Sequence, residues 1–79
     1  MKLPRNLSGS QLSKTLCRDW GYTTAHQTGS HIILDTNEPF NQRIAVPNHK
    51  TLRIGTLNNI LRTVAGHKGV SREKLISTL

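Results

Sequence analysis

The stretch Tyr22-Thr-Thr-Ala-His-Gln-Thr-Gly-Ser-His-Ile-Ile-Leu-Asp35 decides the fold of this chain. Residues 22–27 contain one Tyr and two Thr, residue types that favour β-strands. Thr28 and Gly29 supply a turn, and residues 30–35 form a second run with a β-branched centre. Two such runs on either side of a short turn predict a β-hairpin over residues 22–35.

A helix is predicted before the hairpin, over residues 8–20. Ser8 and Gln11 fit a capping box, in which the side chain of each residue accepts a hydrogen bond from the backbone N–H of the other. Gly21 follows the helix, and glycine is the residue that most easily adopts the left-handed conformation at a helix C-terminus. The apolar positions of this helix recur every four residues and are Leu12, Leu16 and Trp20, with Cys17 beside them.

After the hairpin, residues 36–41 are predicted to form a loop and residues 43–46 a third short strand. Pro47 ends this strand because proline has no N–H to donate to a β-ladder. We expect Thr56 to cap the next helix and Gly66 to end it. The buried stripe of that helix follows the i, i+3, i+4, i+7 pattern and consists of Leu57, Ile60, Leu61 and Val64.

A last short helix follows Ser71, which can serve as its N-terminal cap. The element order α-β-β-β-α with this terminal turn predicts an α+β fold, a three-stranded antiparallel sheet with helices on one face. Strand alternation directs Ile32 and Leu34 toward the helices. The residues left on the other, open face of the second strand are His31, Ile33 and Asp35.

The composition gives 11 Lys and Arg against 4 Asp and Glu, a formal charge of +7 on 79 residues. This length predicts one domain spanning residues 1–79, and the charge indicates an anionic partner, most simply nucleic acid. No apolar run approaches the roughly 20 residues of a membrane span, and the polar N-terminal segment does not fit a secretory signal. We therefore expect a cytoplasmic protein with no membrane partner.

The sequence offers few candidates for metal or nucleophile chemistry. The four acidic residues are dispersed and the spacing of the four histidines matches no zinc pattern, so we expect no metal and no cofactor. Cys17 is the one cysteine, so an internal disulfide is excluded. Its position on the apolar edge of the first helix predicts that it packs as a small, buried hydrophobic residue. Ser30 and His31 are adjacent, and because neighbouring strand residues point to opposite faces, we do not expect them to hydrogen-bond.

His31 has two interpretations from the residues alone. An open-face histidine is available as a general acid or base near neutral pH, but it can also be an ordinary polar residue on a solvent-exposed face. The basic residues are either phosphate contacts or a solubilising surface. Arg43 shares the open face by strand alternation, and the other candidate phosphate contacts are Lys14, Arg18, Lys50 and Arg53.

Three separated motifs resemble those of one family. They are Gly29-Ser30-His31 at the start of the second strand, Val46-Pro47-Asn48-His49 at the end of the third, and Gly55-Thr56-Leu57-Asn58-Asn59-Ile60-Leu61 at the start of the next helix. In this order they are similar to the HicA family of mRNA-interferase toxins, over about residues 7–65. Residues 66–79 extend beyond this resemblance as a C-terminal helical segment.

The resemblance implies a fold like that of double-stranded-RNA-binding domains. It also implies an endoribonuclease of a toxin–antitoxin system that cleaves mRNA, is silenced by a HicB-type antitoxin and uses His31 as its catalytic histidine. His49 matches the histidine of the second motif, for which we infer a structural or RNA-contacting role. The sequence departs from the family at residues 26–28, where basic residues are common and this chain has His-Gln-Thr.

These expectations combine into a metal-independent endoribonuclease in which His31 is the acid or the base. Simple pairing across a two-residue turn would set Gln27 against Ser30 and His26 against His31, which makes His26 a candidate second acid–base group. The alternative is a non-catalytic RNA-binding module of the same fold, which would bind RNA tightly and salt-sensitively without cleaving it.

Overall fold

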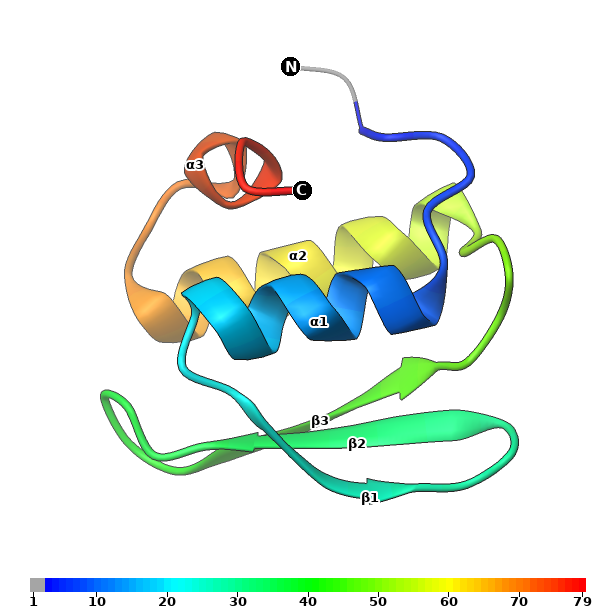
Figure 1. Ribbon diagram of the computed structural model, residues 1–79. Coiled ribbons are helices and arrows are strands. Elements are labelled where there is room, and N and C mark those ends of the chain that lie inside the picture. The colour runs from blue at the N-terminus through cyan, green and yellow to red at the C-terminus, as the bar shows by residue number, and fades with distance from the viewer. Residues whose placement is uncertain (1–2) are drawn as a thin grey trace.

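The computed structural model describes residues 3–79, so the first two residues of the expected domain lie outside it. Helices α1 and α2 cover the same face of a three-stranded sheet, and α3 packs on α2 away from the sheet (Figure 1). This is the predicted α-β-β-β-α arrangement, similar to double-stranded-RNA-binding domains. The elements are α1 Gly9–Asp19, β1 Thr23–Gln27, β2 His31–Thr36, β3 Gln42–Pro47, α2 Ile54–Lys68 and α3 Arg72–Ile76. No helix within residues 3–79 is long and apolar enough to cross a membrane.

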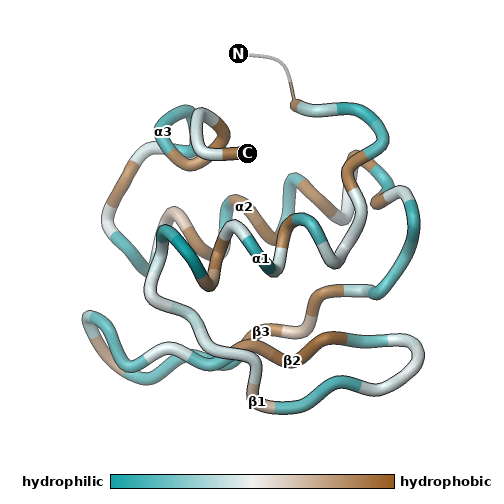
Figure 2. The backbone as a smooth tube through the Cα atoms, viewed as in Figure 1, coloured by the Kyte–Doolittle hydropathy of each residue, from teal (hydrophilic) through white to brown (hydrophobic). Residues whose placement is uncertain are grey.

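The sheet is antiparallel, with strand order β1-β2-β3. Ile32 and Leu34 of β2 are buried under the helices while His31 is exposed, so the predicted assignment of faces is confirmed. On β3, Val46 lies opposite Ile32 and is fully buried. Figure 2 shows hydrophobic stretches along β2 and β3 and mostly polar residues along β1. The core therefore lies between one face of the sheet and the helices, and the other face is open.

Both predicted end signals of α1 are confirmed. The amide of Gln11 donates to Ser8 Oγ at 3.0 Å, and the amide of Ser8 donates to Gln11 Oε1 at 2.9 Å. Gly21 follows the helix with φ of +75°, in the left-handed region. Leu12 and Leu16 are fully buried, so the four-residue spacing of the apolar positions marks the face of α1 that meets the core.

Helix α2 begins earlier than the sequence predicted. Its first residue is Ile54, after Arg53, so Thr56 lies within the first turn and does not cap the helix. No side chain caps this end within the described chain. The usual capping residues, Ser, Thr, Asp and Asn, therefore give no signal for the start of α2. The predicted stripe is otherwise confirmed, because Leu57, Leu61 and Val64 are buried and Ile60 is half-buried.

Helix α2 also ends later than predicted, because it continues through Gly66 to Lys68. The residue with left-handed backbone is Gly69, at φ of +68°. A glycine inside a helix costs only about 1 kcal/mol relative to alanine, which tertiary contacts can offset. Here Lys68 Nζ donates to Thr36 Oγ1 at 2.9 Å, and His67 Nε2 lies 2.8 Å from the carbonyl oxygen of Phe40. These contacts with the end of β2 and with the β2–β3 loop stabilise the last turn.

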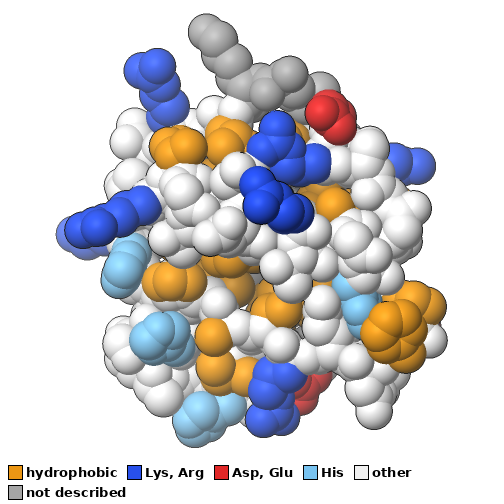
Figure 3. Space-filling model, turned by 180° about the vertical axis from the view of Figure 1, so that it is seen from behind, with side chains coloured by type: hydrophobic (Ala, Val, Ile, Leu, Met, Phe, Trp, Pro, Cys, Tyr) orange, Lys and Arg blue, Asp and Glu red, His pale blue; other side chains and the backbone are white. Residues whose placement is uncertain are grey.

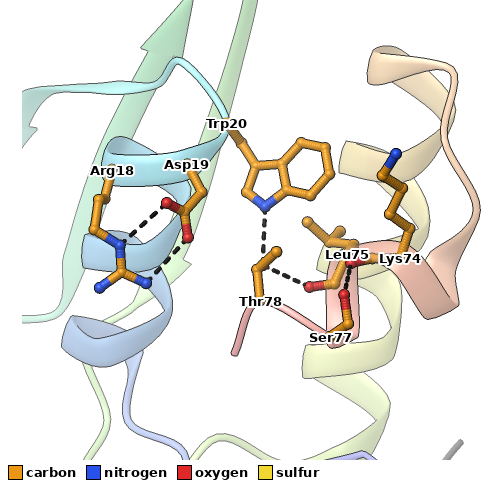
Figure 4. Close-up of polar contacts among 7 residues, drawn as sticks. All are labelled: Arg18, Asp19, Trp20, Lys74, Leu75, Ser77 and Thr78. Atoms are coloured by element: carbon orange, nitrogen blue, oxygen red, sulfur yellow. Dashed lines mark hydrogen bonds and ion pairs between the residues drawn. The ribbon is translucent and has the colours of Figure 1, made fainter.

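The C-terminal segment packs on the rest of the core. Ser71 caps α3 as predicted, since its Oγ accepts from the amide of Lys74 at 3.1 Å. Leu75 is fully buried. The indole Nε1 of Trp20, just after α1, donates to Thr78 Oγ1 at 3.0 Å, as Figure 4 shows. The C-terminus is thus connected to α1 by a hydrogen bond as well as by apolar packing.

Candidate functional site

His31 is the first residue of β2, next to the β1–β2 turn. Its side chain is exposed, and Pro47 of β3 is its backbone partner. Ile33 follows on the same open face and is half-buried. Because the helices cover only the opposite face, the imidazole can meet a macromolecule without any helix moving.

The Ser30 hydroxyl contacts the imidazole of His31, which corrects the expectation drawn from strand alternation. Ser30 Oγ lies 3.0 Å from His31 Nδ1. Alternation does not apply to this pair because β2 begins at His31, and Ser30 belongs to the turn. The contact occupies Nδ1, and Nε2 has no hydrogen-bond partner within residues 3–79.

Thr28 organises the turn that carries this pair. Its Oγ1 accepts hydrogen bonds from the amide of Ser30 at 3.3 Å and from the amide of His31 at 3.0 Å. Its own amide donates to the carbonyl oxygen of His31 at 2.9 Å. These bonds fix the backbone on both sides of the Ser30 side chain, so the approach of Oγ to Nδ1 is a property of the turn.

His26 does not lie opposite His31, contrary to the prediction from simple hairpin pairing. Thr28 faces His31 instead, because the turn residues are Gly29 and Ser30. The same register continues along the hairpin, so Gln27 pairs with Ile32 and His26 with Ile33. Since paired residues share a face, His26 still projects on the open side of the sheet. It is a diagonal neighbour of His31, at roughly 7–8 Å between Cα atoms.

The Val-Pro-Asn-His motif is held beside the same turn. The amide of Asn48 donates to the carbonyl oxygen of Ser30 at 2.9 Å, and the amide of Gly9 donates to that of His49, also at 2.9 Å. A Cβ at Gly9 would lie only 1.9 Å from the carbonyl oxygen of Pro47. Sequence reasoning did not single out Gly9, because a close approach between distant segments leaves no local signal. This packing places the exposed His49 next to the turn.

We call residues 28–31 together with the connection 47–53 the hairpin end of the molecule. Both segments run on the same side of the fold in Figure 1. Lys50 and Arg53 lie in this connection, are exposed, and have no ion-pair partner in the part of the chain that the structure describes. Lys14 lines a groove of about 230 Å³ between α1 and β1. Three of the five Lys and Arg residues predicted to contact phosphate, namely Lys14, Lys50 and Arg53, thus lie at or beside this end.

The other two predicted cations form ion pairs. Arg43 Nε and Nη2 donate to the two carboxylate oxygens of Asp35 at 2.7 and 2.9 Å, and Arg18 donates to Asp19 at 3.1 and 3.0 Å. These hydrogen bonds lower the pKa of each aspartate below its ordinary value. Along β3, Arg43 is four residues from Pro47, about 13 Å at roughly 3.3 Å per residue. The structure thus does not bring Arg43 to the hairpin end.

Three of the four acidic residues, Asp19, Asp35 and Glu38, lie at the opposite end, around Gly21 and the β2–β3 loop, which we call the loop end. Asp19 and Glu38 line one hollow with Gly21, and Asp35 and Glu38 line another. The fourth acidic residue, Glu73, is on α3, which packs on α2. In Figure 3, histidine side chains lie along the left edge of the molecule, the hairpin end seen from behind, and another histidine lies on the right beside a hydrophobic side chain. Carboxylates and exposed imidazoles are thus separated across the fold.

Side chains suited to a metal ion are not clustered in the described chain. Within residues 3–79, no three His, Cys, Asp or Glu side chains could hold a metal ion together. Cys17 is half-buried, with its Sγ 3.9 Å from Thr24 Oγ1. The groups at the hairpin end that can exchange or stabilise charge are therefore imidazoles, hydroxyls and basic side chains.

Comparison with known proteins gives one match. A family model described as "HicA toxin of bacterial toxin-antitoxin" matches residues 9–66, which run from the start of α1 through most of α2. The match includes the turn that carries His31 and the segment that carries His49, and it leaves α3 outside. No curated protein and no solved structure matches the chain significantly. The family model covers well over half of the sequence, and the chain belongs to the HicA family of toxins of bacterial toxin–antitoxin systems.

Proposed function

We propose that this HicA-family protein is an endoribonuclease that cleaves mRNA without a metal ion, with His31 as its catalytic residue, and that a HicB-type antitoxin inhibits it. The observation that carries the proposal is the setting of His31. Its imidazole is exposed, fixed by a turn through one nitrogen, and located at the end of the molecule away from Asp19, Asp35 and Glu38.

RNA supplies its own nucleophile in this reaction, the 2′-hydroxyl. The 2′-oxygen attacks phosphorus, the bond to the 5′-oxygen breaks, and a 2′,3′-cyclic phosphate remains. The 2′-hydroxyl gives a proton to a base, and the departing 5′-oxygen takes one from an acid. Nε2 of His31 makes one of these transfers, and a positioned acid or base contributes typically 10²–10⁴-fold to the rate. His26, the diagonal neighbour on the open face, is the candidate for the other transfer.

The cations around the hairpin end would bind phosphates and stabilise the charge that develops on phosphorus. Lys50 and Arg53 lie on the connection that follows His49, and their charges are not shared with a carboxylate within the described residues. A preorganised cation near developing charge is worth most where no competing anion is present. The concentration of acidic residues at the loop end leaves the hairpin end suited to a polyanion.

The antitoxin would bind the open face of the sheet. That face carries the half-buried Ile33 and the exposed Ala45 opposite it, which offer apolar contacts beside His31. An acidic partner would be attracted to a chain of charge +7 before any contact forms. A protein seated there would cover the imidazole and prevent RNA from reaching it.

The decisive experiment compares wild-type protein with His31→Ala on an RNA substrate in the presence of EDTA. We expect wild type to cleave and to leave a cyclic phosphate, and His31→Ala to lose cleavage by at least about 100-fold while keeping RNA binding. His67→Gln is the matched control, because His67 contacts the β2–β3 loop at the far end and should retain activity. Cleavage by His31→Ala, or loss of wild-type cleavage in EDTA, would show the proposal to be wrong.

The same experiment decides the alternative, a non-catalytic RNA-binding module. That module would bind RNA with a steep salt dependence, give no product with wild type, and show no effect of His31→Ala. Growth arrest on induction of wild type but not of His31→Ala would extend the result to the cell.

A further inference from the structure

His31 has two ring nitrogens, and the turn occupies one of them. Ser30 Oγ lies 3.0 Å from Nδ1, whereas Nε2 has no partner within residues 3–79. We propose that Ser30 is a positioning residue whose hydroxyl holds Nδ1, so that Nε2 alone exchanges protons with RNA. The inference rests on the proposed function for its chemical use, but the contact itself can be tested without any cleavage.

The Thr28 hydroxyl lies next to the Ser30 hydroxyl, on the side away from the imidazole. Thr28 Oγ1 accepts from the amides of Ser30 and His31, which fills both of its lone pairs. Its own proton is then free to be donated, and the two acceptors within reach are Ser30 Oγ at 3.4 Å and the carbonyl oxygen of His31 at 3.3 Å. Ser30 therefore stands between a threonine hydroxyl and the imidazole in a short hydroxyl chain.

A hydroxyl suits this position because it can both donate and accept. When Nδ1 carries no proton, Ser30 donates to it; when Nδ1 is protonated, in one neutral tautomer and in the imidazolium, Ser30 accepts from it. The contact thus survives each protonation state that catalysis requires. If Nε2 takes the 2′-hydroxyl proton, the imidazolium keeps its Nδ1–H on Ser30 Oγ. If Nε2–H protonates the 5′-oxygen, the ring is left neutral with the same contact. No bond to Ser30 forms, so the serine is not a nucleophile.

The kinetic test compares Ser30→Ala with Ser30→Thr, which keeps the hydroxyl at an exposed position. We expect Ser30→Ala to lower kcat about tenfold, the effect of losing one oriented hydrogen bond, with KM little changed. Ser30→Thr should restore kcat. Thr63→Ala, which removes an exposed hydroxyl from α2, is the matched control and should behave as wild type.

The second test is the ¹⁵N NMR spectrum of the His31 ring, which does not depend on activity. Ser30→Ala should change the Nδ1 resonance and the balance of tautomers, and Thr63→Ala should change neither. An unchanged spectrum, or a wild-type kcat in Ser30→Ala, would overturn the inference while leaving the proposed function intact. A wild type that binds RNA without cleaving it would instead overturn the proposed function, and the spectrum would still decide whether Ser30 holds the ring.

Discussion

Gly9→Ala should be among the most damaging single-methyl additions in this protein. Gly9 opens α1 against the end of β3, where a Cβ would lie 1.9 Å from the carbonyl oxygen of Pro47, 3.0 Å from its carbonyl carbon and 3.3 Å from Asn48 Cα. All three atoms belong to the backbone, so no rotamer change can relieve the clash. The helix and the strand end must separate.

Separation breaks what holds the Val-Pro-Asn-His motif. The hydrogen bond from the Gly9 amide to the carbonyl oxygen of His49 would break. The hydrogen bond from the Asn48 amide to the carbonyl oxygen of Ser30 would weaken. Overpacking costs typically about 1–3 kcal/mol and each hydrogen bond about 1 kcal/mol, offset by at most about 1 kcal/mol of helix propensity. The expected net loss is about 2–4 kcal/mol of unfolding free energy, which in a domain of this size lowers Tm by roughly 10–25 °C.

Guanidinium unfolding followed by circular dichroism measures this loss, and Gly66→Ala is its matched control. Gly66 also lies in a helix, but a Cβ there would meet no atom within 4 Å. The control should be as stable as wild type or more stable by up to about 1 kcal/mol. Equal midpoints for Gly9→Ala and wild type, or equal losses for both variants, would refute the argument that backbone approach at Gly9 sets the geometry beside His31.

Two further predictions concern charge. Burial raises the pKa of Tyr22 from 10.0 to about 12, because the folded protein favours the neutral phenol. The stability that the buried neutral phenol contributes is fully present below pH 10 and is lost as the pH rises toward 12. Alkaline unfolding of wild type and of Tyr22→Phe should therefore differ between pH 10 and pH 12. Lys50→Ala should weaken RNA binding and reduce the salt slope by about 0.7, measured by titration at several salt concentrations. Arg43→Ala should reduce the slope less, because Asp35 already pairs with that guanidinium; an equal reduction would contradict the assignment.

The parts of the fold that obey local rules could be predicted from sequence. The capping box of Ser8 and Gln11 depends on residues three apart, and the alternation of Ile32 and Leu34 depends on the strand period alone. These signals suffice to place the helix, the hairpin and the open face. The same alternation places His31 on the open face, because its neighbour Ile32 points to the buried face.

Errors arose where contacts between distant segments outweigh local preference. Helix α2 passes through Gly66 because Lys68 binds the β2–β3 loop. The hairpin turns at Gly29 and Ser30, one residue later than the expected Thr28 and Gly29, so His26 pairs with Ile33 and not with His31. The Ser30 contact was missed for a related reason, since a one-residue difference in where β2 begins changes the direction of a side chain.

The separation of charge bears on how one small fold could serve both RNA and an antitoxin. The Asp35–Arg43 pair occupies the open face toward the loop end, whereas Lys50 and Arg53, at the hairpin end, have no ion-pair partner within the described residues. In the proposed function, RNA phosphates and the acidic side chains of an antitoxin would be drawn to the same cations, Lys50 and Arg53. Two anionic partners that need the same cations exclude each other by occupancy. Inhibition then requires no change in the shape of the toxin, which agrees with an active site whose imidazole is already exposed and fixed by its turn.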